Sequence, residues 1–273
     1  SIPNPHHQQM SYDLIVLGSG PGGYVAAIRA SQLGLKTAIV EKESLGGICL
    51  NWGCIPTKAL LKSANVFEYI HHAKDYGITV GAPTADFKGV VQRSRDVAKG
   101  MSNGVQFLMK KNKIDVVLGT GVLKPGKKLE VTGADGKKQV LEAKHLIVAT
   151  GARSRELPAL KQDGKKVIGY REAMVLPEMP KSLVVVGSGA IGSEFAYFYN
   201  AMGAKVTLVE FMPNVVPVED DDVSKQLEKS FRKQGIEVMT SSEVTKVDTG
   251  GKGCKVTVKS AKGEQVIECD IVL

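Results

Sequence analysis

The sequence contains no apolar run as long as the roughly 18 residues of a membrane span. It has only four cysteines in 273 residues, and residues 1–9 carry no apolar core like that of a signal peptide. We expect residues 1–10 to be a tag or processing remnant, and we expect no membrane association. Few cysteines without a secretory segment indicate a reducing compartment, the cytoplasm, where a disulfide is more often catalytic than structural.

Aromatic residues make up only 5% of the chain, so its net charge of +8 is not accompanied by the stacking side chains of many nucleic-acid-binding surfaces. The lysines are scattered over expected helix ends and turns, and no nucleic-acid-binding motif surrounds them. We therefore expect solvated charged faces and no nucleic-acid partner.

Cys49 and Cys54 lie within the run GGICLNWGCIPTK, residues 46–58. A disulfide needs Cα atoms within roughly 4.4–6.8 Å, whereas five extended residues span about 17 Å, so the intervening chain must fold tightly. Gly53 supplies the backbone freedom for this, and Pro56 is tolerated in the first turn of a helix beginning near Cys54. The positive end of that helix would favour a thiolate at Cys54.

A redox-active pair fits these two cysteines best. The alternatives are two buried free cysteines or half of a zinc site, although zinc would need a second pair of ligands and none lies nearby. Cys254 and Cys269 occupy strand-like segments and are expected to be structural. The adjacent histidines His71 and His72 would point about 100° apart on a helix and cannot share a metal, so we expect no metal site.

An internal repeat with an offset of 169 residues aligns residues 14–41 with residues 183–210, and eleven of the 28 positions are identical. Each copy reads as an apolar strand, a G-x-G-x-x-G turn, a helix ending at glycine, and a second strand ending in an acid. The glycines and acids are Gly18, Gly20, Gly23 and Glu41 in the first copy, and Gly187, Gly189, Gly192 and Glu210 in the second.

This context is typical of dinucleotide binding, since the first glycine makes a tight turn, the second admits the pyrophosphate and the third packs helix on strand. The pyrophosphate would lie at the helix N-terminus, and the acid would accept a hydrogen bond from a ribose hydroxyl. A glycine-rich turn without a ligand is the alternative at each copy. Phe211 and Met212, rather than a basic residue, follow Glu210, so the second site favours NAD over NADP.

The length suits two domains, and the patterns predict an α/β fold with two Rossmann-like units, each with a parallel sheet and a small antiparallel β-meander. Between the repeats we expect a helical region with a break at 77–83, then antiparallel strands and one apolar strand. The predicted ranges are helical 69–113, strands 115–123, 129–132, 139–141 and 145–149, helix 222–234, and strands 237–239, 255–259 and 266–273.

Residues 11–273 resemble the dihydrolipoamide dehydrogenases, which are flavin-dependent pyridine nucleotide-disulfide oxidoreductases. The resemblance rests on the two dinucleotide turns and on the cysteine motif G-G-x-C-L-N-x-G-C-I-P-T-K. Leu50, Ile55 and the run 167–173 are closer to this subfamily than to glutathione or mercuric reductases. The resemblance implies an FAD-binding domain over 11–152, an NAD-binding domain over 153–273, and the cofactors FAD and NAD.

The resemblance also implies roles for single residues. Cys54 would be the thiol nearest the flavin, Cys49 the interchange thiol that meets the substrate, and Lys58 and Glu194 a pair beside the flavin N5. The first copy of the repeat would bind FAD together with Gly121, Ala149, Thr150 and Gly151, and the second copy would bind NAD together with Val244.

The implied activity is oxidation of protein-bound dihydrolipoyl groups with reduction of NAD, by a homodimer that meets lipoylated carriers of 2-oxoacid dehydrogenase or glycine-cleavage complexes. Family members also use a Gly-Asp motif and a partner-subunit His–Glu pair from a C-terminal interface domain, and neither is in this chain. We therefore expect a fragment with little or no turnover alone. The alternatives are a glutathione- or mercuric-reductase-like enzyme and a non-catalytic nucleotide-binding fragment.

Overall fold

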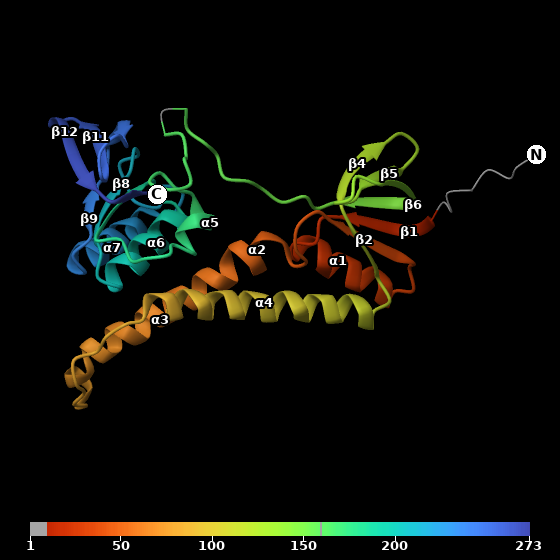
Figure 1. The fold of residues 1–273 in the computed structure, drawn as a ribbon, viewed down its shortest axis with the longest axis horizontal. Coiled ribbons are helices and arrows are strands. Elements are labelled where there is room, and N and C mark those ends of the chain that lie inside the picture. The colour runs from red at the N-terminus through yellow and green to blue at the C-terminus, as the bar shows by residue number, and fades with distance from the viewer. Residues whose placement is uncertain (1–9, 159) are drawn as a thin grey trace, which may run out of the picture. The chain divides into compact units, whose positions relative to one another are not determined.

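The computed structural model describes residues 10–158 and 160–273, which divide into two compact units (Figure 1). The first unit contains the chain up to Pro56 together with Arg95–Arg153, and the second contains Thr57–Ser94 and Ser154–Leu273. The predicted remnant lies outside the described residues except for Met10, which begins the first strand. The predicted domain limits stay predictions.

The first unit is built on a six-stranded sheet in the order β3-β2-β1-β6-β5-β4. Its strands are β1 Met10–Leu17, β2 Thr37–Glu41, β3 Asp115–Leu118, β4 Thr120–Lys124, β5 Lys128–Thr132 and β6 Lys138–Val148. Strands β1, β2, β3 and β6 pair in parallel, and β4, β5 and the start of β6 form an antiparallel meander.

Two apolar clusters cover the two faces of this sheet. Helices α1 (Pro21–Gln32) and α4 (Phe87–Lys111) lie on one face (Figure 1). They bury Ala27 and Met109 against Val16. On the other face, the meander packs Leu129 against Ile15. The parallel strands that carry the predicted dinucleotide turn are therefore buried on both sides, as their apolar runs predict.

Two strand predictions in this unit are wrong. The range 115–123 is divided at Gly119, where φ is +154° and a Cβ would lie 2.5 Å from the carbonyl oxygen of Thr132, so β3 and β4 have different partners. The ranges 139–141 and 145–149 belong to the single strand β6, because its first residues pair with β5 on one side while the strand pairs with β1 on the other.

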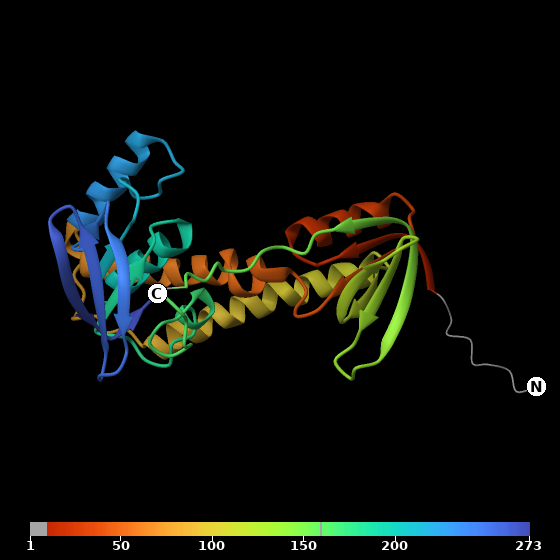
Figure 2. The same cartoon turned by 90° about the horizontal axis from the view of Figure 1, so that it is seen from above.

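The second unit has a parallel sheet in the order β13-β7-β8-β9, formed by β7 Ser182–Val186, β8 Lys205–Val209, β9 Glu237–Met239 and β13 Ile271–Val272. Helices α6 (Ala190–Ala201) and α7 (Asp221–Lys233) pack on it, and α5 (Tyr170–Ala173) precedes it. Strands β10 Glu243–Asp248, β11 Cys254–Ser260 and β12 Gly263–Cys269 form a separate antiparallel sheet (Figure 2, blue).

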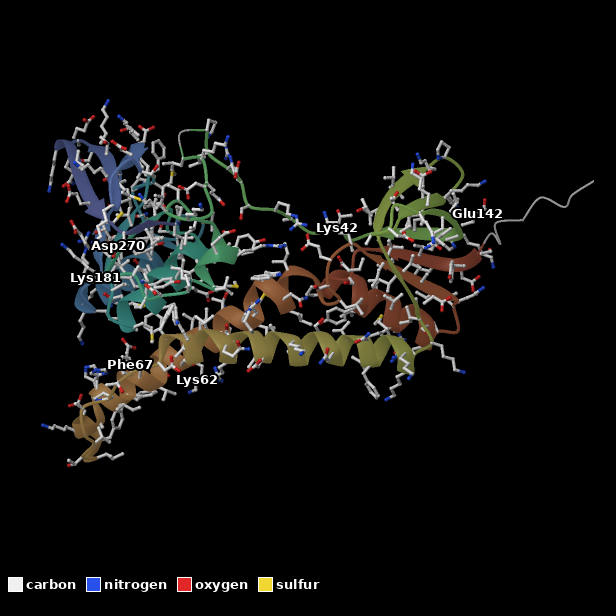
Figure 3. All side chains as sticks on the ribbon, viewed as in Figure 1. Lys42, Lys62, Phe67, Glu142, Lys181 and Asp270 are labelled. Carbon is white, nitrogen blue, oxygen red and sulfur yellow. A yellow bond between two sulfur atoms is a disulfide. The ribbon has the colours of Figure 1, made fainter. Side chains whose placement is uncertain are left out.

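The prediction of one strand over 266–273 is wrong, because β12 and β13 belong to different sheets. Between them, the carboxylate of Asp270 accepts hydrogen bonds from the backbone N–H groups of Lys181 (2.8 Å) and Ser182 (3.2 Å) (Figure 3). These bonds turn the chain from the antiparallel sheet into the parallel one. Strand β10 was not predicted, whereas β9 matches its predicted range.

The predicted fold class is confirmed, since each unit combines parallel strands with an antiparallel meander, within one mixed sheet in the first unit and in two separate sheets in the second. In the part of the chain that the structure describes, no helix combines the length and the apolar character needed to cross a membrane.

Candidate functional site: a disulfide beside a dinucleotide turn

Cys49 and Cys54 are joined by a disulfide, with Cα atoms 4.7 Å apart. Cys49 lies in the short helix α2 (Gly47–Trp52), and Cys54 is the first residue of α3 (Cys54–His71). Gly53 separates the helices, and a Cβ there would lie 2.9 Å from the carbonyl oxygen of Ile48 and 3.1 Å from the Cα of Cys49. The tight fold of this segment therefore depends on glycine.

The bond excludes two free thiols as the state of this pair. No group of three or more potential metal ligands occurs among residues 10–158 and 160–273, so nothing there completes the alternative zinc site.

Side chains from α2 and α4 hold the disulfide segment in place. The Asn51 amide donates to the carbonyls of Leu45 and Gly47, each over 2.9 Å. From α4, Arg95 donates to the carbonyl of Asn51 (2.8 Å) and lies over the ring of Trp52. Burial lowers the pKa of Arg95, but a guanidinium keeps its charge at any ordinary pH.

The first glycine turn lies between β1 and α1, against the end of β6. At Gly18, φ is +102° and a Cβ would lie 2.2 Å from the carbonyl oxygen of Ala149. At Gly23, a Cβ would lie 1.9 Å from the carbonyl oxygen of Gly18, whereas at Gly20 it would meet nothing within 4 Å. The first and third glycines thus permit close packing, and the second borders open space.

The predicted acid Glu41 ends β2 and is only 8% exposed. Its Oε2 accepts hydrogen bonds from the backbone N–H (3.0 Å) and the hydroxyl (2.6 Å) of Ser19, and its Oε1 accepts one from the N–H of Glu43 (2.8 Å). Glu43 also forms an ion pair with Arg153.

The other residues predicted for the first site lie near the same strand ends. Ala149, Thr150 and Gly151 follow β6 directly, and the N–H of Ala149 donates to the carbonyl of Leu17 (2.8 Å). Gly121 lies on β4, where a Cβ would come within 2.7 Å of the Leu17 side chain.

The second glycine turn, between β7 and α6, repeats the geometry of the second and third glycines, but a Cβ at Gly187, where φ is +97°, would meet nothing within 4 Å. At Gly192, a Cβ would lie 1.9 Å from the carbonyl oxygen of Gly187, and at Gly189 it would meet nothing within 4 Å. Glu210 is 6% exposed, and its Oε2 accepts from the N–H (2.8 Å) and hydroxyl (2.7 Å) of Ser188. Its Oε1 accepts from the N–H of Met212 (2.8 Å).

Ser19 and Ser188 were missed in the sequence, although both are among the eleven identical positions of the repeat. Their identity in both copies was a usable signal. Arg95 was also missed, and nothing near it in the sequence marks its contact with α2.

Lys58 and Glu194 form an ion pair between α3 and α6, within the second unit. Their side chains are 61% and 30% exposed, so the pair adds at most about 1 kcal/mol to stability. The same helices are joined by the Tyr197 hydroxyl, which donates to Glu68 over 2.6 Å and whose pKa burial raises to about 12.

Val244 is buried in β10 beside Val258, within the apolar cluster of the second unit. Its predicted contact with NAD stays a prediction, as do the predicted roles of the other site residues.

Both glycine turns fit a dinucleotide. Gly20 and Gly189 are the N-caps of α1 and α6 with the same backbone conformation (φ −64°, ψ −178° and −179°), and neither helix has a side-chain cap or an acid in its first turn. The positive end of each helix therefore remains for an anion such as a pyrophosphate, although in α1 Pro21 has no N–H and the N–H of Gly23 donates to the carbonyl of Gly20 (2.8 Å). The space beside the second glycine admits such an anion.

A family model described as pyridine nucleotide-disulphide oxidoreductase matches residues 12–273. The chain is 51% identical over 272 residues to a dihydrolipoyl dehydrogenase of Rhizobium etli, covering 93% of this chain and 56% of that protein. A dihydrolipoyl dehydrogenase of Zymomonas mobilis is 48% identical over 253 residues, with coverage of 93% and 54%.

Among solved structures, LpdA from Mycobacterium tuberculosis matches with a TM-score of 0.87 and 28% identity, covering 97% of this chain and 57% of that one. The chain thus spans little more than half the length of the relatives it matches. It carries the disulfide, both glycine turns and both acids, and the family model covers nearly all of it. The chain belongs to the pyridine nucleotide-disulphide oxidoreductase family.

Proposed function

We propose that this chain provides the redox disulfide and two nucleotide sites of a dihydrolipoyl dehydrogenase, which oxidises protein-bound dihydrolipoyl groups and reduces NAD. One observation carries the proposal: the disulfide segment begins against the first dinucleotide turn. The N–H of Gly46 donates to the carbonyl of Ser19 (3.0 Å), and a Cβ at Gly47 would lie 2.6 Å from the Cα of Gly20. The redox disulfide and the proposed FAD site are thereby joined by direct backbone contacts.

The thiol steps follow from the disulfide. One substrate thiolate attacks the Sγ of Cys49, the Cys49–Cys54 bond breaks, and its electron pair leaves on Cys54 as a thiolate. The second substrate thiolate attacks the substrate sulfur of this mixed disulfide, which releases Cys49 and closes the lipoyl ring. The substrate's two thiol protons pass to solvent when its thiolates form, so it has then lost two electrons and two protons, and the two cysteines hold the electrons.

Cys54 suits the role of electron donor because it begins α3, where the positive end of a helix stabilises a thiolate. Lys58 follows one turn later on the same helix, and Glu194 neutralises it. We propose that these residues flank the reacting end of FAD.

The first turn with Glu41 would hold FAD, together with the residues Ala149, Thr150 and Gly151, and the second turn with Glu210 would hold NAD. FAD held there would supply two-electron chemistry between the thiolate of Cys54 and NAD. The chain's own residues bind and orient these groups. The carboxylate of Glu210 would repel a 2′-phosphate, so NAD is preferred to NADP.

As part of the same proposal, the partners are lipoyl-bearing carrier proteins, the enzyme is a homodimer, and the compartment is the cytoplasm. The relatives named dihydrolipoyl dehydrogenase support the first two assignments.

The proposal is tested in the protein that carries this chain, reconstituted with FAD. Dihydrolipoamide should bleach the flavin absorbance without oxygen, and added NAD should then yield NADH at 340 nm. Cys54→Ser should abolish both changes, whereas the matched control Cys254→Ser, at a buried cysteine of the second unit, should retain them. Full activity in Cys54→Ser would refute the proposal.

The same preparation tests the alternative of another flavin disulfide reductase. Oxidised glutathione and mercuric ion replace the lipoyl substrate, with NADH or NADPH as reductant. A strong preference for NADPH and for either of these substrates would favour the alternative.

A further inference from the structure

Each glycine turn contains a serine directly after its first glycine, Ser19 in the first turn and Ser188 in the second. The two serines make the same contacts with the acid of their turn. Ser19 and Ser188 are both fully buried, and each directs its backbone N–H and its hydroxyl at one oxygen of an acid, Glu41 at the end of β2 or Glu210 directly after β8. The hydroxyl bonds, at 2.6 Å and 2.7 Å, are in the range of charge-assisted hydrogen bonds to a carboxylate.

These contacts determine what each acid can still accept. An ionised carboxylate offers about four acceptor positions. The serine occupies two on Oε2, and the N–H of Glu43 or Met212 occupies one on Oε1. Within the hydrogen bonds of residues 10–158 and 160–273, each acid therefore has one acceptor position left, on Oε1. Because both of its carboxylate oxygens accept hydrogen bonds, the orientation of each carboxylate is fixed.

Beyond the acid, the two serines have different contacts. Ser19 accepts from the N–H of Gly46 at its carbonyl (3.0 Å), and its hydroxyl lies 3.4 Å from the carbonyl of Ser44, so it reaches the segment that enters α2. Ser188 instead accepts from the N–H of Val216, at its hydroxyl and at its carbonyl, each at 3.1 Å. It thereby fixes the loop that follows β8.

We propose that Ser19 and Ser188 are positioning residues that orient Glu41 and Glu210 toward a single ribose hydroxyl, and that Ser19 also aligns the disulfide segment with the first nucleotide site. This inference rests on the proposed function, because it assumes that both turns bind dinucleotides. The serines touch no cofactor in this role and act through the acids.

The experiment uses Ser19→Ala and Ser188→Ala, which remove each hydroxyl and leave the backbone bonds possible. FAD affinity of the apoprotein is measured by flavin fluorescence, and NADH affinity by nicotinamide fluorescence. Ser19→Ala should weaken the binding of FAD about tenfold and leave the affinity for NADH unchanged. Ser188→Ala should do the reverse, since each variant loses one charge-assisted hydrogen bond. Each serine is therefore the matched control for the other.

A second ligand separates orientation from a general structural role. NADH whose adenosine ribose lacks the 2′-hydroxyl cannot use the oriented carboxylate of Glu210. Ser188→Ala should therefore weaken the binding of NADH about tenfold but leave the affinity for this deoxy analogue nearly unchanged. Equal weakening of both ligands would overturn the orienting role. If Ser19→Ala fails to fold, the Ser188→Ala series tests the same geometry.

The link to the disulfide that the Ser19 hydroxyl supplies runs through Glu41, which also accepts a hydrogen bond from the N–H of Glu43 in the segment that enters α2, so loss of the hydroxyl should loosen this segment although the Gly46–Ser19 backbone bond remains. This link has its own readout. Without nucleotide, dithiothreitol should reduce the Cys49–Cys54 bond several-fold faster in Ser19→Ala than in the unaltered protein, and at the unaltered rate in Ser188→Ala. Equal rates in all three proteins would overturn the link. If the unaltered protein bound neither nucleotide, the proposed function would fail too, whereas normal binding with unaffected serine variants would refute this inference alone.

Discussion

The guanidinium of Arg95 lies 4.5 Å from the ring centroid of Trp52. The same side chain donates to the carbonyl of Asn51, so α4 holds the C-terminal end of α2, one residue before the break at Gly53. A cation over an aromatic ring and a charged donor on a helix-end carbonyl both stabilise this arrangement. The helix that carries Cys49 is thus fixed from outside its own segment.

Replacing Arg95 with alanine should lower the free energy of unfolding by about 1–3 kcal/mol, because the ring contact and the carbonyl bond are lost together. Urea unfolding measures the loss, and dithiothreitol should reduce the disulfide faster in this variant. Lys99→Ala, at an exposed position of α4, is the control. Equal stabilities of the two variants would show that Arg95 does not hold α2.

Gly53→Ala should destabilise the first unit by about 1–3 kcal/mol, because its Cβ would enter contacts of 2.9 Å and 3.1 Å with backbone atoms. We also expect slower reoxidation of the cysteine pair, followed by thiol titration. In Gly100→Ala, on α4, the Cβ meets nothing within 4 Å, so that variant should be neutral or up to about 1 kcal/mol more stable. The same loss in both variants would contradict the close packing at Gly53.

The second glycine turn allows folding and binding to be separated. Gly189→Ala should fold normally, because its Cβ meets nothing within 4 Å. It should weaken the binding of NADH at least tenfold, because the added methyl group fills the space beside the helix N-terminus. Gly192→Ala should fail to fold stably, since its Cβ would lie 1.9 Å from the Gly187 carbonyl oxygen. Thermal unfolding and NADH fluorescence measure the two effects. Unchanged NADH affinity in Gly189→Ala would contradict a dinucleotide at this turn.

Cys254 and Cys269 face each other as register partners on β11 and β12, and both are buried. Burial raises the pKa of both thiols, that of Cys269 to about 12. At pH 8, iodoacetamide should label neither thiol in the folded protein and both in urea, because the thiolate is the reacting form. Mass spectrometry of the labelled peptides decides this, and rapid labelling of folded protein would contradict it.

The same raised pKa has a consequence for stability. The folded state keeps the Cys269 thiol protonated above its ordinary pKa of 9.0, while the unfolded state can ionise it. Its contribution to stability is therefore complete below about pH 9 and is lost as the pH rises toward 12. Cys269→Ser should flatten this part of the pH profile of unfolding, whereas an unchanged slope would show that another group controls it.

Much of this architecture could be predicted because its causes are local in sequence. The glycine turns, their terminal acids and the cysteine spacing each lie within about 30 residues, and the repeat reinforces them. The ends of elements were less predictable. Gly119, where an added Cβ would clash with Thr132, divides the range 115–123, and Asp270 redirects the chain by binding Lys181 and Ser182, far away in sequence.

The supporting contacts of the site were hidden for the same reason. Arg95 reaches Asn51 across 44 residues, and Ser19 reaches Glu41 across 22, so no spacing rule for a helix or strand relates either pair. The Lys58–Glu194 ion pair spans 136 residues and was anticipated only through the family resemblance.

Residues 42–46 connect the first acid to the disulfide helix, and they are hydrogen-bonded along their length. Glu43 donates to Glu41, the hydroxyl of Ser19 lies 3.4 Å from the carbonyl of Ser44, and Gly46 donates to Ser19. Such a connection cannot absorb a change of length. One inserted residue would rotate the helix that carries Cys49 by about 100° and shift it about 1.5 Å along its axis relative to the first glycine turn, and Cys54 would move with it. Deletions and insertions between the acid and the disulfide should therefore be tolerated far less than substitutions.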